Sequence, residues 1–186
     1  MAKHYFADRT FSKVSKLEPG EYDNCQFDNC LLPKAKLSEY TFTDCNFTDC
    51  DLSNVKLKET ALKKVTFKGC KLLGVCFDDC KEFLFEVRFK NCSLELASFR
   101  DLKMKGTPFK KCHLIETDFR GANLQDAVFS QCDLNRAVFE RTDLRKSDFR
   151  TSFNIRISPE DNRLRGARFS PDSLPGLLEE YGIIVE

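Results

Sequence analysis

Large apolar side chains recur at every fifth position over most of the sequence. One run extends from Leu17 to Phe77 and a second from Phe89 to Phe149, and a small or thin residue stands two positions before each large one. This period matches neither an α-helix, with roughly 3.6 residues per turn, nor the alternation of a strand. A chain that turns a corner at every fifth residue satisfies it, because each side of the coil can then send one large and one small side chain inward.

The identities of the inward residues repeat at every fourth side of the coil. The spacing is 20 residues, with a single spacing of 22 between Phe67 and Phe89. The sequence therefore predicts four sides per coil, which is an all-β, quadrilateral β-helix built by stacking internal repeats. Three columns carry this signal: Phe27, Phe47, Phe67, Phe89, Phe109, Phe129 and Phe149; Leu32, Leu52, Leu72, Leu94, Leu114 and Leu134; and Cys30, Cys50, Cys70, Cys92, Cys112 and Cys132.

The two extra residues lie in a bulge in the segment 79–86. An uninterrupted register would point Glu82 into the core, which is unfavourable for a charge without a partner. A bulge instead lets Phe83, Leu84 or Phe85 fill the core and leaves the others outside. Two interpretations stay open: a kink that corrects the register, or an exposed Phe, with Phe83 and Phe85 as candidates, that anchors a binding partner.

The pattern changes after residue 169. Ser170 is expected to be a helix N-cap with Pro171 at the first helical position, and Gly182 suits the end of the helix. We therefore predict a repeat β-helix over residues 1–169 and a short capping helix and strand over 170–186, since a solenoid needs its last coil covered. The apolar residues of this cap are Leu174, Leu177, Leu178, Tyr181, Ile183, Ile184 and Val185.

The overall charge gives no reason to expect binding to nucleic acid or membranes. The 186 residues contain 30 basic and 29 acidic side chains, a formal net charge of +1, and 186 residues suit one domain with a sizeable core. The segment from Met1 to Thr10 lacks the apolar stretch of a signal peptide, and no apolar run approaches the roughly 18 residues of a membrane span. We therefore expect a cytoplasmic protein.

Ten cysteines in a cytoplasmic protein are expected to be reduced. The cysteine column has two interpretations, a metal or redox array and a set of thin core residues. Successive cysteines would lie about 4.8 Å apart along the stack, and a straight column does not converge on one point as zinc ligands must. Packing is therefore favoured, because a free cysteine behaves as a small buried apolar residue.

Candidate catalytic groups are few. The two histidines are His4 and His113, and His113 is expected to point outward because it precedes the inward Leu114. No glycine-rich phosphate loop is present, and a solid core leaves no cavity for a substrate. We therefore expect a protein that is not an enzyme, with no metal, catalytic residue or cofactor.

The repeat of a small residue, a polar residue, Leu or Phe, and two polar residues resembles the pentapeptide-repeat family. Clear examples are the units at residues 122–126 (Ala-Asn-Leu-Gln-Asp) and 142–146 (Thr-Asp-Leu-Arg-Lys), and the resemblance extends from about Leu17 to Phe149. It implies that the solenoid is right-handed.

The helix-and-strand end resembles that of the topoisomerase-protecting members of the family, the Qnr, MfpA and McbG group. This resemblance implies a homodimer and a protein partner, DNA gyrase or topoisomerase IV, bound by DNA mimicry in resistance to a drug such as a quinolone or to a toxin. The apolar residues expected at the dimer interface are Leu177, Leu178, Tyr181, Ile183, Ile184 and Val185, more than a monomer end usually exposes.

The charges on the predicted surface are mixed, whereas DNA mimicry requires an acidic one. One partly acidic column, Glu39, Glu59, Asp79 and Asp101, is the candidate partner-binding surface, but cations stand beside it. Two functions therefore stay open, a topoisomerase binder and a solenoid that binds an unrelated protein. The neighbouring cations are Lys36, Lys56, Lys58 and Arg100, and a second side turns basic at Lys68, Arg88, Lys90, Lys110 and Lys111.

Overall fold

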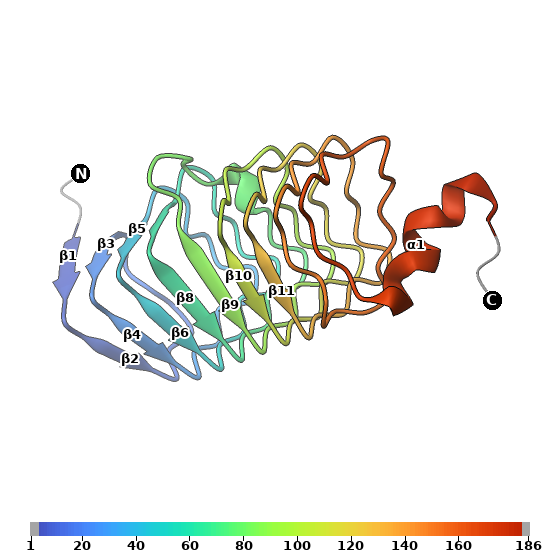
Figure 1. Cartoon of the computed structure of the whole chain (residues 1–186). Helices are drawn as coiled ribbons and strands as arrows, with labels where there is room; N and C mark the ends of the chain where they lie inside the picture. Colours follow the sequence, from blue (N-terminus) through green and yellow to red (C-terminus); the bar gives the residue numbers. More distant parts are fainter. Residues whose placement is uncertain (1–3, 184–186) are drawn as a thin grey trace.

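The computed structural model describes residues 4–183 and confirms the predicted quadrilateral β-helix. Figure 1 shows the coils stacked into a rod, with the amino-terminal strands at one end and the helix α1 at the other. Two parallel sheets cover two of the four sides. The smaller contains β1 (His4–Ala7), β3 (Gly20–Asp23), β5 (Thr41–Thr43) and β7 (Ala61–Lys63); the larger contains β2 (Thr10–Ser12), β4 (Gln26–Asp28), β6 (Asn46–Thr48), β8 (Val65–Lys68), β9 (Val87–Lys90), β10 (Pro108–Lys110) and β11 (Val128–Ser130).

The strand register reproduces the spacing seen in the sequence. In the larger sheet Phe27 is paired with Phe47 and Phe67 with Phe89, so the spacing is 20 residues in the first pair and 22 in the second. The first coil is shorter, because Phe11 is paired with Phe27, only 16 residues away. The other two sides are joined by single bridges, such as the one between Asp51 and Lys71.

Most corners of the coil are made by a residue in the left-handed backbone region. Asn29, Asp49 and Asn91 have φ values of 54°, 52° and 54°. Asn and Asp tolerate this conformation better than most residues, and Gly, found at Gly69, adopts it without a Cβ clash. Leu96 adopts it too, with φ 57°, although a large side chain makes the conformation costly.

The phenylalanine column forms a continuous stack along the rod. Phe109 is fully buried, and its ring centroid lies 5.3 Å from that of Phe89 and 4.9 Å from that of Phe129, with the rings nearly parallel. The inward leucine and cysteine columns are buried beside it. Nine rings belong to this stack: Phe11, Phe27, Phe47, Phe67, Phe89, Phe109, Phe129, Phe149 and Phe169.

The thin inward residues donate hydrogen bonds as well as filling space. The Cys50 thiol donates to the carbonyl oxygen of Phe27 at 3.2 Å, and the Thr117 hydroxyl to that of Leu94 at 2.9 Å. In each case the acceptor is the large residue of the preceding coil. The side chain therefore donates a hydrogen bond to a backbone carbonyl group that is buried away from water.

The bulge occupies the coil that follows the last strand of the smaller sheet, β7. A 3-10 turn, η1 (Phe77–Asp79), precedes it. Phe83 is 75% exposed, Leu84 is 60% exposed, and Phe85 is partly buried against the core. Glu82 is also exposed, so the extra residues keep its carboxylate out of the core.

The carboxyl-terminal cap starts where the sequence predicts, with Ser170 at the N-cap position and Pro171 first in the helical segment. The first turn is a 3-10 helix, η2 (Pro171–Ser173), followed by α1 (Leu174–Leu178) and η3 (Glu179–Tyr181), and Ser170 makes no side-chain cap hydrogen bond. The apolar residues of the cap differ in burial: Leu174 and Tyr181 are about half exposed, whereas Leu177 packs against the core.

Two glycines shape this cap, one inside α1 and one after η3. A Cβ at Gly176 would lie 1.7 Å from the Ile155 carbonyl oxygen, so this glycine lets the helix approach the last coils closely. Gly182 ends the helix in the left-handed region, with φ 63°, as predicted. The predicted strand at Ile183 to Val185 falls largely outside the described residues, and Ile183 itself is not in a strand.

Replacing Phe109 with Ala is expected to lower the free energy of unfolding by about 3–5 kcal/mol, the usual cost of truncating a buried Phe. Denaturant unfolding measures this change. The matched control is Phe83→Ala, which removes an exposed ring and should cost less than about 0.5 kcal/mol. Similar losses for the two variants would contradict the burial of the column.

Candidate interaction surfaces

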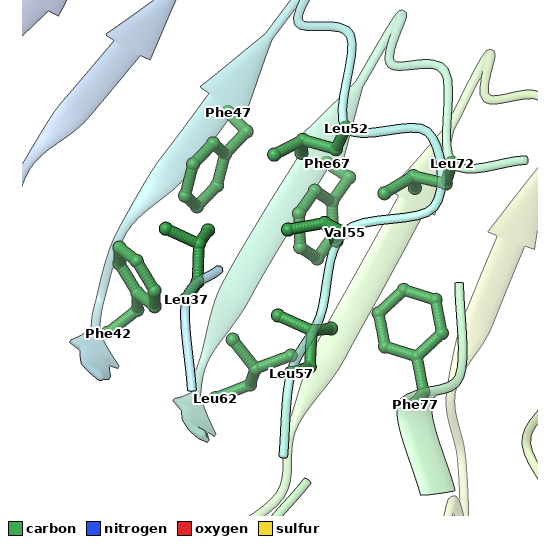
Figure 2. A pocket seen from close by; sticks show the side chains of 10 residues that line it. All are labelled: Leu37, Phe42, Phe47, Leu52, Val55, Leu57, Leu62, Phe67, Leu72 and Phe77. Atoms are coloured by element: carbon green, nitrogen blue, oxygen red, sulfur yellow. The ribbon is translucent and has the colours of Figure 1, made fainter. Parts of the chain in front are cut away.

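A small apolar cavity lies in the core formed by residues 4–183 and is too small for a substrate. Its volume is about 20 Å³, and Figure 2 shows Leu57 and Leu62 among the side chains that line it. A cavity of this size holds about one water molecule, whereas ligand sites usually measure about 300 Å³ or more. The lining residues are Leu37, Phe42, Phe47, Leu52, Val55, Leu57, Leu62, Phe67, Leu72 and Phe77.

This cavity forms where the second aromatic column changes sides. Tyr22 and Phe42 belong to the smaller sheet, whereas from Phe77 onward the aromatic residues lie on a different side. The coil between them carries leucine at both positions, Leu57 and Leu62. The larger hollows, such as the one between the last coil and α1, are open surface depressions.

The acidic column lies along one corner of the rod. Glu39, Glu59, Asp79 and Asp101 are all exposed. The backbone N–H of Glu59 donates to the carbonyl oxygen of Asp79 at 2.9 Å, which places these two residues in successive coils. Lys36 and Lys56 form a bridge on the adjoining side, so cations lie beside the column as the sequence indicated. The corner presents carboxylates at the coil spacing of about 4.8 Å.

Of the two candidate anchors in the bulge, only Phe83 is available to a partner. Its side chain is exposed, and its neighbour Leu84 has φ 59°, an unusual conformation for a large residue. Phe85 packs partly against the core instead. The Lys103 ammonium lies 3.6 Å from the Glu82 carboxylate and links the bulge to the next coil.

Toward the carboxyl-terminal end, arginines are paired with aspartates two residues earlier. Arg145 donates to Asp143, and Arg150 donates to Asp148, with closest distances of 2.5 and 2.7 Å. These hydrogen bonds hold the pKa of both carboxyl groups below the usual range. The spacing is visible in the sequence, because the residues on either side of an inward Leu or Phe both point outward.

The carboxyl-terminal end leaves several apolar side chains exposed. Tyr181 is 46% and Ile183 is 54% exposed, and Leu178 is partly buried. The Tyr181 hydroxyl donates to Glu160 at 3.1 Å. Of the other three residues predicted at a dimer interface, Leu177 is partly buried against the core, and Ile184 and Val185 lie outside the described residues.

The cysteine column is buried and all ten thiols are free. Nine are buried, and Cys76 is the exposed one. Burial raises the pKa of Cys45 to about 12, so this thiol stays protonated at neutral pH. Within residues 4–183, no group of three or more His, Cys, Asp or Glu side chains is arranged to hold a metal ion. His4 and His113 are both exposed.

The Pentapeptide repeat region profile matches residues 21–99 and 83–169, and the chain belongs to the pentapeptide-repeat family. No curated protein sequence matches the chain significantly. Among solved structures, a trypsin-treated form of QnrB1, a plasmid-mediated fluoroquinolone resistance protein, is 20% identical, with 99% of this chain and 98% of that one covered and a TM-score of 0.48. HetL, from the cyanobacterium Nostoc, is 17% identical over 90% of this chain and 83% of that one, with a TM-score of 0.31.

Across the described part of the chain, no helix is long and apolar enough to cross a membrane.

Thiol labelling of the folded protein is expected to modify Cys76 first and the nine buried thiols only after unfolding. The reaction of Cys76 should be slower than that of a free cysteine, because partial burial and the neighbouring Asp78 and Asp79 raise its pKa. Rapid alkylation followed by mass spectrometry gives both counts. A total well below ten in denaturant, or stoichiometric zinc, would contradict the packing interpretation of the column.

Proposed function

We propose that the chain is a non-catalytic binding protein whose partner is a type II topoisomerase such as DNA gyrase. The acidic corner formed by Glu39, Glu59, Asp79 and Asp101 would lie against a basic DNA-binding groove of that enzyme. The observation that carries the proposal is the regular column of exposed carboxylates on the rod. Protection against a drug such as a quinolone, or against a toxin, is the biological consequence expected from such binding.

The dimensions of the rod support this proposal. The phenylalanine stack from Phe11 to Phe169 contains eight coil-to-coil steps. At about 4.8 Å per step the rod is about 40 Å long, and an end-to-end dimer would be about twice that length. A rigid rod of this length fits a groove that normally holds duplex DNA.

The charge distribution limits the strength of the interaction. Lys36 and Lys56 lie beside the acidic corner, and the formal net charge of the whole chain is +1. Attraction to a basic groove is therefore local and modest, and it should weaken as the salt concentration rises. A solenoid that binds an unrelated protein is the second candidate function, favoured by this mixed surface.

Purified protein is expected to inhibit gyrase supercoiling weakly to moderately at low salt. Replacing Glu39, Glu59, Asp79 and Asp101 with Lys should reduce the inhibition, because the substitutions reverse the charge facing the groove. All four side chains are exposed, so the fold should survive. Supercoiling assays with and without a quinolone, together with direct binding measurements, test the prediction.

The matched control for this experiment reverses four carboxylates elsewhere on the rod. Asp8, Asp44, Asp49 and Glu116 are exposed and lie on other corners of the rod, so they are not part of the acidic corner. Their replacement with Lys changes the net charge equally and should leave more inhibition than the corner variant does. If the protein neither binds gyrase or topoisomerase IV nor changes their activity, the second candidate function replaces the first.

We also propose that two copies join through their carboxyl-terminal ends. Exposed Tyr181 and Ile183, with partly buried Leu178, give this end an apolar surface that a second copy would cover. A two-fold axis lets the same residues pair with themselves.

Light scattering is expected to give about twice the chain mass of 21.5 kDa. Deleting residues 182–186 should yield a monomer or aggregates, because it removes part of the apolar surface. Tyr5→Ser, which changes an exposed aromatic residue at the opposite end, is the control and should remain dimeric. An unchanged dimer after the deletion would place the interface elsewhere.

A further inference from the structure

Three lysines stand in register on the outer face of the larger sheet. Lys68 of β8 is paired with Lys90 of β9, and Lys90 is paired with Lys110 of β10. Their side chains are exposed and project from the same face, since each follows an inward Phe by one residue. Arg88 and Lys111 are exposed beside them. We call these three residues, Lys68, Lys90 and Lys110, the lysine ladder.

The ladder is unfavourable for the isolated protein. Like charges directly opposite each other on neighbouring strands destabilise a sheet. No ion pair or hydrogen bond of a ladder ammonium group is found within residues 4–183, whereas Arg145 and Arg150 are each paired with an aspartate. Arg88 is also paired, with Glu86 at 2.7 Å. The column itself does not require lysine, because the positions before and after the ladder are Thr48 and Ser130.

A second feature lies in the same coil as the middle of the ladder. The bulge raises Phe83 and Leu84, both exposed, only a few residues before β9 begins. The intervening Glu86 is tied to the neighbouring coil, because its backbone N–H donates to the Leu62 carbonyl oxygen at 3.0 Å. Phe83 and Leu84, which we call the apolar tip, therefore lie one corner of the coil away from the lysine ladder. They are in the same coil as Lys90.

We infer that the lysine ladder and the apolar tip together bind an acidic segment of a protein partner, one that carries carboxylates beside an apolar side chain or pocket. The carboxylates supply the counter-ions that the ladder lacks, and Phe83 and Leu84 bury apolar surface against the partner. This surface is opposite in charge to the acidic corner, and its assignment does not rest on the proposed topoisomerase binding.

The apolar tip favours a protein segment over nucleic acid. Leu84 offers an aliphatic side chain that does not stack on bases as an aromatic ring does. The ladder itself carries no aromatic residue, and neither do the exposed positions beside it, such as Arg88 and Asn91. A nucleic acid would contact the ladder through phosphates and stack at most one base on Phe83, and it would leave the aliphatic Leu84 without an apolar partner.

The experiment measures binding of a fluorescein-labelled poly-glutamate peptide of about 20 residues, an extended acidic segment, by anisotropy at low salt. A second peptide has leucine at every fourth position. The triple variant Lys68→Thr, Lys90→Thr and Lys110→Thr should weaken binding of both peptides about tenfold. Phe83→Ser should weaken binding of only the leucine-containing peptide. The midpoint of thermal unfolding of the triple variant should not fall, because the ladder is repulsive in the free protein.

The matched control removes three lysines from another side, Lys36→Thr, Lys56→Thr and Lys58→Thr. Lys36 and Lys56 are also in register but lie beside the acidic corner, so binding should weaken less than about twofold. Equal weakening by the two triple variants, or absence of peptide binding at low salt, would overturn the inference. Tighter, ladder-dependent binding of duplex DNA of equal charge would overturn it too, and would assign the ladder to nucleic acid.

Discussion

The structure depends on a corner that the chain can turn at every fifth residue without losing its hydrogen bonds to the next coil. Residues such as Asn29 and Asn91 turn in the left-handed backbone region, while the backbone N–H of Asn91 donates to Lys110 in the next coil at 2.8 Å. The conformation costs roughly 1–2 kcal/mol for a residue with a side chain. Coil-to-coil hydrogen bonds and the stacked core offset that cost, and they also fix which side chains point inward.

Most of the fold could be predicted from the sequence because this geometry repeats. The column from Phe27 to Phe149 fixes the number of sides, and the 22-residue spacing locates the bulge. Periodicity carries no information where the repeat ends. The cap is therefore predicted from helix start and stop residues alone. These residues do not indicate that Leu174 and Tyr181 are exposed.

The surfaces were harder to predict than the core. The acidic column and the basic side are exposed, as predicted, because the register fixes which positions point outward. Sequence reasoning did not identify which charges are paired, because pairing depends on side-chain reach across a corner or within a side. It treated Cys50 and Thr117 as thin residues, although both donate hydrogen bonds to the preceding coil. The donors were recognisable in retrospect, since Cys, Thr and Ser share that position.

The filled core of residues 4–183 leaves the outer surface of the rod for recognition. A residue repeated in one column produces a straight row of the same chemical group, so a partner meets rows of charge rather than a pocket. The acidic corner and the lysine ladder are two such rows, on different sides and of opposite sign. Such a rod can contact two differently charged surfaces at once.

The bulge also bears on how the chain finds its correct alignment during folding. A stack with a uniform 20-residue repeat could shift by a whole coil and still place Phe on Phe, because neighbouring coils are nearly interchangeable. The 22-residue coil between Phe67 and Phe89 and the 16-residue coil between Phe11 and Phe27 remove that degeneracy. In a shifted alignment, each irregular coil would occupy a position in the stack that fits a regular coil. The mismatch would force residues such as Glu82 into the core. The irregular coils thus favour one alignment of the chain over several similar ones.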